Sequence, residues 1–102
     1  MCDNITINEV RPEVQAFAVE MEKILRENDH KGGWRNCGYT FLKYRAVKHM
    51  VNVVERVESG HINENMLKEC YHSANYLMMM CDTLTNDMKT FGQEASNETT
   101  TE

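Results

Sequence analysis

Apolar residues in the first third of the chain recur at intervals of three and four, which is the spacing of one face of an α-helix. They are Val10, Val14, Phe17, Met21 and Leu25. Glutamates fall between them, as is typical of a helix with one buried side. Pro12 lies where this helix would begin, and proline is tolerated there because a first turn leaves its N–H unused. The pattern predicts a helix over residues 12–28.

A glycine-rich stretch, NDHKGGWRNCG, interrupts the pattern between residues 28 and 38 and predicts a loop. A second helical face follows, made of Val47, Met50, Val54 and Val57. Ser59-Gly60 would end this helix, because glycine readily adopts the left-handed conformation that closes a helix. The second predicted helix therefore covers residues 39–58.

Asn63 is placed to cap a third helix, which the apolar spacing carries to about Asp82 or to Met88. Its centre, from Tyr76 to Cys81, is apolar on nearly every side. A helix buried on all sides in a three-helix chain needs a second subunit, so we expect self-association through this helix. Residues 1–10 form a polar lead, residues 11–90 the helical domain, and residues 91–102 a tail of disordered composition.

The predicted class is therefore all-α: a helical bundle of three main helices per chain, antiparallel in consecutive pairs and completed by oligomerisation. With 102 residues there is room for one domain. The formal net charge of −5 argues against nucleic acid as a partner, because phosphate backbones favour broad positive surfaces. No apolar run approaches the roughly 18 residues of a membrane span. Four cysteines without a zinc-binding spacing or a signal peptide indicate thiols in the cytoplasm.

Against this acidic background, basic residues gather on one stripe of the second helix. Arg45, His49, Asn52 and Arg56 follow one another at steps of four, three and four, with Lys48 beside them. A matching polar stripe on the third helix carries Glu69, His72 and Tyr76. Such stripes are often solvated surface, but the remaining faces of the third helix are apolar, which favours two stripes that face each other.

The segments DHKGGWRNC and KECYHSANYLMMMCD resemble the MazG-like all-α nucleoside triphosphate pyrophosphohydrolases, whose members include short phage-encoded chains. The resemblance covers roughly Val10 to Leu84. It implies a helical bundle of the same kind, and from the apolar third helix we expect a dimer or tetramer. It also implies a site in which a helix with Glu-Glu-x-x-Glu faces a helix with Glu-x-x-Asp. In the family these carboxylates hold magnesium, which binds the triphosphate and activates the water that releases pyrophosphate.

This chain departs from the family at the carboxylates themselves. Arg45 and Ala46 stand where the paired glutamates belong, and His49 stands at the third position. The second motif keeps Glu69 but has His72 in place of the aspartate. Magnesium takes oxygen ligands, so one carboxylate cannot build the family's metal site. Arginine, by contrast, can bind phosphate directly through paired hydrogen bonds.

Our leading hypothesis is therefore a catalytically inactive relative that needs no cofactor and binds or sequesters a phosphorylated nucleotide. If the chain is phage-encoded, this would be the capture of a host nucleotide signal in the host cytoplasm. The predicted ligand-binding residues are Arg45, Lys48, His49, Asn52, Arg56, Glu69, His72, Tyr76, Trp34 and Lys31.

Two alternatives stay open. His49, Glu69 and His72 together offer two imidazoles and a carboxylate, a set that can hold a divalent metal ion with open positions. Such a rebuilt metal site would allow an active pyrophosphohydrolase. The other alternative is a structural or protein-binding bundle in which the pocket is closed.

Overall fold

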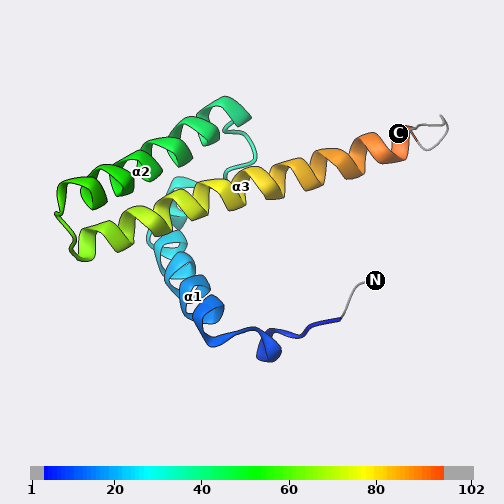
Figure 1. Cartoon of the computed structure of the whole chain (residues 1–102). Helices are drawn as coiled ribbons and strands as arrows, with labels where there is room; N and C mark the ends of the chain where they lie inside the picture. Colours follow the sequence, from blue (N-terminus) through cyan, green and yellow to red (C-terminus); the bar gives the residue numbers. More distant parts are fainter. Residues whose placement is uncertain (1–3, 96–102) are drawn as a thin grey trace.

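The protein is described by a computed structural model that covers residues 4–95, with side chains described through residue 90. Within this range it contains three α-helices and no strand (Figure 1). The helices are α1 (Pro12–Glu27), α2 (Tyr39–Ser59) and α3 (Glu64–Ala95), and two 3₁₀ turns, η1 (Ile7–Glu9) and η2 (Asp29–Lys31), flank α1. The all-α class and the three predicted helices are confirmed.

The helix ends follow the local chemistry that predicted them. Pro12 occupies the first turn of α1. Gly60 ends α2 in the left-handed conformation, with φ 79° and ψ 9°, and the next N–H, that of His61, bonds to the Arg56 carbonyl at 3.0 Å. The side chain of Asn63 accepts a hydrogen bond of 3.0 Å from the N–H of Asn65, which caps α3. These local signals therefore set where each helix begins and ends.

The two ends of the chain carry more helical structure than predicted. In the lead, η1 is stabilised by a capping box, because the N–H of Thr6 donates to the Glu9 carboxylate at 2.8 Å. At the other end, α3 continues to Ala95, past residue 91 where the tail was predicted to begin. No proline lies between Met88 and Ala95, so nothing in the backbone forces an earlier stop. Residues 1–3 and 96–102 lie outside the described range.

The helices do not all pair as consecutive antiparallel neighbours. Helices α2 and α3 lie side by side and antiparallel, whereas α1 crosses the first half of α3, near Tyr71 and Asn75 (Figure 1). Ser73 ties α3 to α2, since its hydroxyl donates to the Ala46 carbonyl at 2.8 Å. Asn75 ties α3 to α1 through a 3.2 Å hydrogen bond from its side-chain amide to the Met21 carbonyl. The antiparallel prediction therefore holds for α2 and α3 and is wrong for α1.

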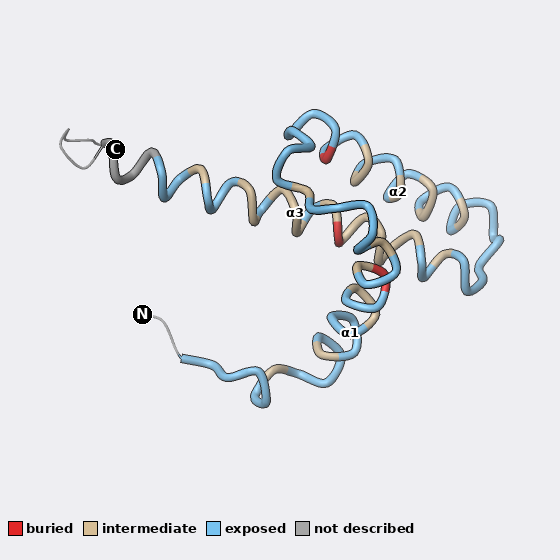
Figure 2. The backbone as a smooth tube through the Cα atoms, turned by 180° about the vertical axis from the view of Figure 1, so that it is seen from behind, coloured by how far each residue is buried: buried red, intermediate tan, exposed pale blue. Residues whose placement is uncertain are grey.

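The fully buried core of the single chain is small. Among the side chains of residues 4–90, those classed as buried are Ile24, Leu42 and Asn75 (Figure 2). The radius of gyration is 17.0 Å, whereas a compact domain of this length would have about 13 Å. The chain is therefore open and extended. Within the described range no helix is both apolar enough and long enough to span a bilayer.

Candidate functional site

One cleft lies where α1, the glycine-rich loop, α2 and α3 meet, and its volume is about 650 Å³. It gathers six of the ten predicted ligand-binding residues, although they come from three separate segments of the chain. These six are Lys31, Trp34, Arg45, His49, His72 and Tyr76. The two polar stripes thus face each other at this point, as predicted.

Flat side chains are layered against one another on one wall of the cleft. The ring of His49, from α2, stacks on His72 with 4.9 Å between centroids and an interplanar angle of 22°. The same ring is nearly parallel to Tyr76, one helical turn further along α3, at 5.8 Å and 7°. The guanidinium carbon of Arg45 lies 5.6 Å from the centre of the Tyr76 ring. A cation over an aromatic face is attracted by the ring's negative face, so Tyr76 helps to place the arginine.

Glu69 lies behind this wall and holds His49 in place. Its carboxylate accepts a 2.6 Å hydrogen bond from His49 Nδ1 and one of 3.1 Å from the Asn52 amide. Burial alone would raise the pKa of Glu69, but these hydrogen bonds and the positive charge of a protonated His49 outweigh it, so the net pKa is lowered. Glu69 is therefore a charged partner that fixes the imidazole, and it is not among the residues that line the cleft.

His72 is shifted toward its neutral form. Burial lowers its pKa most, and the charge of neighbouring His49 lowers it further, while Glu69 opposes both effects. Arg45 and Lys31 carry the permanent positive charge of the cleft. His72 adds charge only in more acidic solution or when an anion bound beside it raises its pKa.

Three buried polar atoms at the cleft have no hydrogen-bond partner among the described residues. They are Arg45 Nε, His49 Nε2 and Asn75 Oδ1. Each belongs to a residue that lines the cleft, and Asn75 is only 2% exposed. Buried polar groups are normally paired, because leaving one unpaired costs about 1–3 kcal/mol. The wall of the cleft thus contains unpaired donors and acceptors within one small region.

Asp82 fixes the glycine-rich loop over the cleft, a role that the sequence did not reveal. Its carboxylate accepts hydrogen bonds from Trp34 Nε1 at 3.1 Å and from the Arg35 guanidinium at 3.0 Å. Asp82 lies six residues after Tyr76, about 120° away from the polar stripe around the helix, so the spacing gave no signal for it. Asn75 was not among the predicted ligand-binding residues, although it belongs to the segment KECYHSANYLMMMCD that carries the family resemblance.

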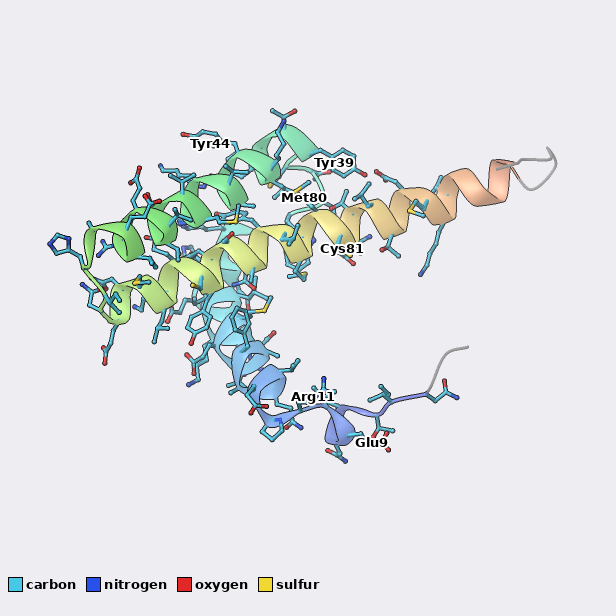
Figure 3. The ribbon with its side chains drawn as sticks, viewed as in Figure 1. Glu9, Arg11, Tyr39, Tyr44, Met80 and Cys81 are labelled. Carbon is cyan, nitrogen blue, oxygen red and sulfur yellow. The ribbon has the colours of Figure 1, made fainter. Side chains whose placement is uncertain are left out.

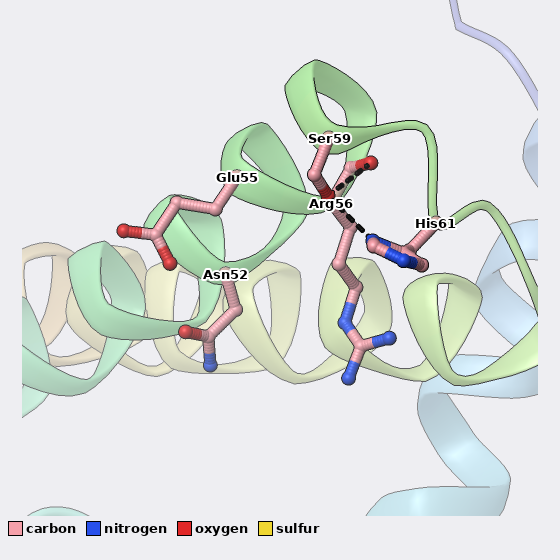
Figure 4. A pocket seen from close by; sticks show the side chains of 5 residues that line it. All are labelled: Asn52, Glu55, Arg56, Ser59 and His61. Atoms are coloured by element: carbon pink, nitrogen blue, oxygen red, sulfur yellow. Dashed lines mark hydrogen bonds between the residues drawn. The ribbon is translucent and has the colours of Figure 1, made fainter.

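The remaining predicted residues do not join the cleft. Asn52 and Arg56 line a separate, shallow hollow of about 410 Å³ near the end of α2, together with Glu55, Ser59 and His61 (Figure 4). There the Ser59 hydroxyl lies 2.9 Å from His61 Nδ1. Lys48 is exposed and lines neither cavity. The polar stripe of α2 extends beyond the end of the cleft, so Arg56 lies outside the cleft that Arg45 lines.

The alternative metal set is close in space but does not converge. His49 and His72 are stacked nearly parallel, so their ring nitrogens lie in adjacent planes, and His49 Nδ1 is engaged with Glu69. Among the residues described, no group of three or more histidine, cysteine, aspartate or glutamate side chains is arranged to hold a metal ion.

Comparisons with protein-family models, curated proteins and solved structures give no match to this chain.

Proposed function

We propose that this chain binds a phosphorylated nucleotide in the 650 Å³ cleft without hydrolysing it. The observation that carries the proposal is the meeting of cationic and aromatic side chains from three segments in one cavity. Arg45 and Lys31 supply positive charge, and Trp34 and Tyr76 supply flat apolar faces. A nucleotide has the complementary parts, namely an anionic phosphate and a planar base.

The size and charge of the cleft agree with such a ligand. Small-molecule sites usually enclose about 300–1,000 Å³, which includes this value. Asp29 is the one carboxylate among the described residues that line the cavity, and the nearby Glu69 carboxylate is paired with His49, so repulsion of a phosphate is weak. Charge-assisted hydrogen bonds to arginine are worth about 1.5–3 kcal/mol each. Phosphate recognition by Arg45 would therefore dominate the affinity.

A relationship to the MazG-like pyrophosphohydrolases remains part of this proposal. It rests on the two sequence segments named above and on an all-helical fold that suits the family. In that relationship, Arg45, His49 and His72 replace carboxylates that would hold magnesium. The expected consequence is a site that binds the family's type of ligand but cannot assemble the metal centre that hydrolyses it.

The test is calorimetric titration of a nucleotide panel, including cyclic and ADP-ribose-type compounds, in the presence of a chelator. Wild-type protein is compared with Arg45→Glu and with Lys89→Glu, which makes the same charge change on an exposed residue of α3 outside the cleft. We expect binding of at least one nucleotide by the wild type and by Lys89→Glu. Arg45→Glu should bind at least about ten-fold more weakly, since it removes one charge-assisted bond and adds repulsion.

Absence of binding at up to millimolar nucleotide, or equal affinity of wild type and Arg45→Glu, would refute the proposal. Hydrolysis is tested separately with ordinary nucleoside triphosphates and magnesium. We expect no release of pyrophosphate above a protein-free blank. Release that a chelator abolishes would show that the chain is an enzyme with a metal site of different composition.

A further inference from the structure

Helix α2 has an apolar stripe on the side that faces away from α3. Its members are Val47, Met50, Val51, Val54 and Val57, and each is between 43% and 53% exposed. Figure 2 shows this outer side of α2 as largely exposed, and in Figure 3 Tyr44 projects from the helix near the same side. At about 100° per residue these positions lie opposite Arg45 and His49, which point to the cleft. No helix of the described chain covers the stripe.

The spacing of the stripe is that of a helix-pairing seam. Val47 and Val54 are seven residues apart, and so are Met50 and Val57, which gives the apolar a and d positions of two heptads. A helix face of this kind packs well against another with the same repeat. The chain itself provides one such face, and every copy of the chain carries it.

The stripe is complementary to itself when two copies run antiparallel. With a two-fold axis between Met50 and Val51, Val47 of one copy lies opposite Val54 of the other. In the same register Lys43 at one end lies opposite Glu58 at the other, and this happens twice. Both side chains are exposed, and neither makes an ion pair within the described part of the chain. A parallel pair would instead place Lys43 against Lys43 and Glu58 against Glu58.

We propose that α2 pairs antiparallel with α2 of a second copy about this axis, with the valine stripe as the interface and two Lys43–Glu58 ion pairs at its ends. Isologous pairing of one patch with itself is the commonest way in which proteins form dimers. The interface lies on the opposite side of α2 from the cleft. The proposal is therefore independent of whether the cleft binds a nucleotide.

This surface differs from the one that the sequence suggested. The run from Tyr76 to Cys81 was expected to need a second subunit, yet Tyr76, Met78, Met79 and Met80 are already partly buried within the single chain. Contacts of α3 with α1 and α2 provide that cover. The five stripe residues of α2 have no such cover, so the stripe has the stronger need for a partner. Association through α3 remains an untested prediction.

Sedimentation equilibrium of the whole chain tests the pairing. We expect the wild type to sediment at twice 11.9 kDa at tens of micromolar concentration. Val54→Glu, which places a charge in the middle of the stripe, should sediment as a monomer. Circular dichroism at the same concentration checks that its helices form, and retained helicity is expected because Val54 is 48% exposed in the single chain.

Charge reversal tests the direction of pairing. Lys43→Glu and Glu58→Lys should each weaken the dimer by about ten-fold, because two attractive pairs become repulsive in each variant. Mixing these two variants should restore the dimer as a heterodimer with two opposite-charge pairs. Glu55→Lys makes the same change as Glu58→Lys on the same helix but off the stripe, and should leave the dimer unchanged.

A wild-type monomer at these concentrations would overturn the proposal, and so would a Val54→Glu dimer as stable as the wild type. Equal stability of the wild-type and Lys43→Glu dimers would overturn the antiparallel arrangement, because a parallel pair merely exchanges one like-charge contact for another. None of these measurements involves nucleotide, so failure here leaves the proposed function to its own test.

Discussion

The two sides of α2 differ in polarity, and their arrangement is the reverse of that in a simple amphipathic helix. Polar residues lie on the side that packs against α3, and apolar residues lie on the side that faces outward. The inner side, against α3, carries Arg45, His49 and Asn52, all partly buried. The outer side carries valines that are about half exposed. In an ordinary surface helix the apolar stripe faces the core and the polar stripe faces water.

In the single chain, burial is therefore not matched to polarity on either side of α2. A polar stripe tolerates an inner position only when its groups find partners, as His49 and Asn52 do in Glu69. In the dimer that we propose, the outer apolar stripe would be covered by the same stripe of a second copy. We therefore interpret the inner side as the ligand-binding side of α2 and the outer side as its association side.

The largest expected effect is on the free energy of unfolding. It distinguishes a residue that is buried within the single chain from one that would be buried only in the proposed dimer. Leu42, on the inner side, is 0% exposed. Leu42→Ala should lower the free energy of unfolding by about 2–5 kcal/mol at every protein concentration, because it leaves a cavity in the core. Val54→Ala should lower the free energy of unfolding only at protein concentrations where dimers form. Denaturant unfolding over a range of concentrations measures both, and a concentration-independent loss in Val54→Ala would contradict the assignment of the outer side.

A smaller effect is expected at the loop that covers the cleft. Asp82→Asn removes the charge that holds Trp34 and Arg35, so the free energy of unfolding should fall by about 0.5–1 kcal/mol, as for other partly exposed ion pairs. Trp34 is the single tryptophan, and its emission should shift to longer wavelength as it gains water. Asp87→Asn, five residues further along α3, is the matched control, because Asp87 bonds to Tyr39 and not to the loop. An unchanged emission in Asp82→Asn would show that the loop is held by other contacts.

The smallest effect is the dependence of stability on pH. Because the pKa of His72 lies below 6.5 in the folded chain, the unfolded chain takes up a proton first as the solution is acidified, and stability falls. The pKa of Glu69 lies below 4.5, so its contribution is present above that value and is lost as the pH falls through its folded pKa. His72 should make the melting temperature decrease as the pH falls below about 6.5, and Glu69 should add a further decrease below about pH 4.5.

Substitution separates the two groups. His72→Asn should remove the part of this decrease that begins near pH 6.5, while His30→Asn, in the exposed turn η2, should not change it. A melting temperature of the wild type that rises on acidification would contradict the burial of His72.

The sequence predicted the helices well because their signals are local. Pro12, Gly60 and Asn63 act within a turn or two of the chain, and period-3.6 spacing needs no knowledge of other segments. The sequence also predicted that Arg45 and Tyr76 lie near each other, since the spacing of the polar residues identified both stripes. The crossing of α1 over α3 was not, because it depends on contacts such as that between Asn75 and the Met21 backbone, 54 residues away.

The extent of the site was overestimated for a related reason. A stripe on a helix has no natural end in the sequence, so Lys48, Asn52 and Arg56 were grouped with Arg45. In space, the cleft ends where α1 and the loop stop contributing walls, and this limit is set by the tertiary arrangement. Asp82 was missed because its partner, the loop at Trp34, lies 48 residues away.

The central claim, that a phosphorylated nucleotide binds beside Arg45 in the cleft, is tested most directly by the fluorescence of Trp34. This residue lines the cleft and is the single tryptophan, so its emission reports on that place alone. Titration with the tightest nucleotide of the panel, in chelator and corrected for nucleotide absorption, should give a saturable change in wild type and in Lys89→Glu. Arg45→Glu should need at least about ten times more nucleotide. Calorimetric binding without any change in Trp34 emission, or an identical titration of Arg45→Glu, would contradict the account.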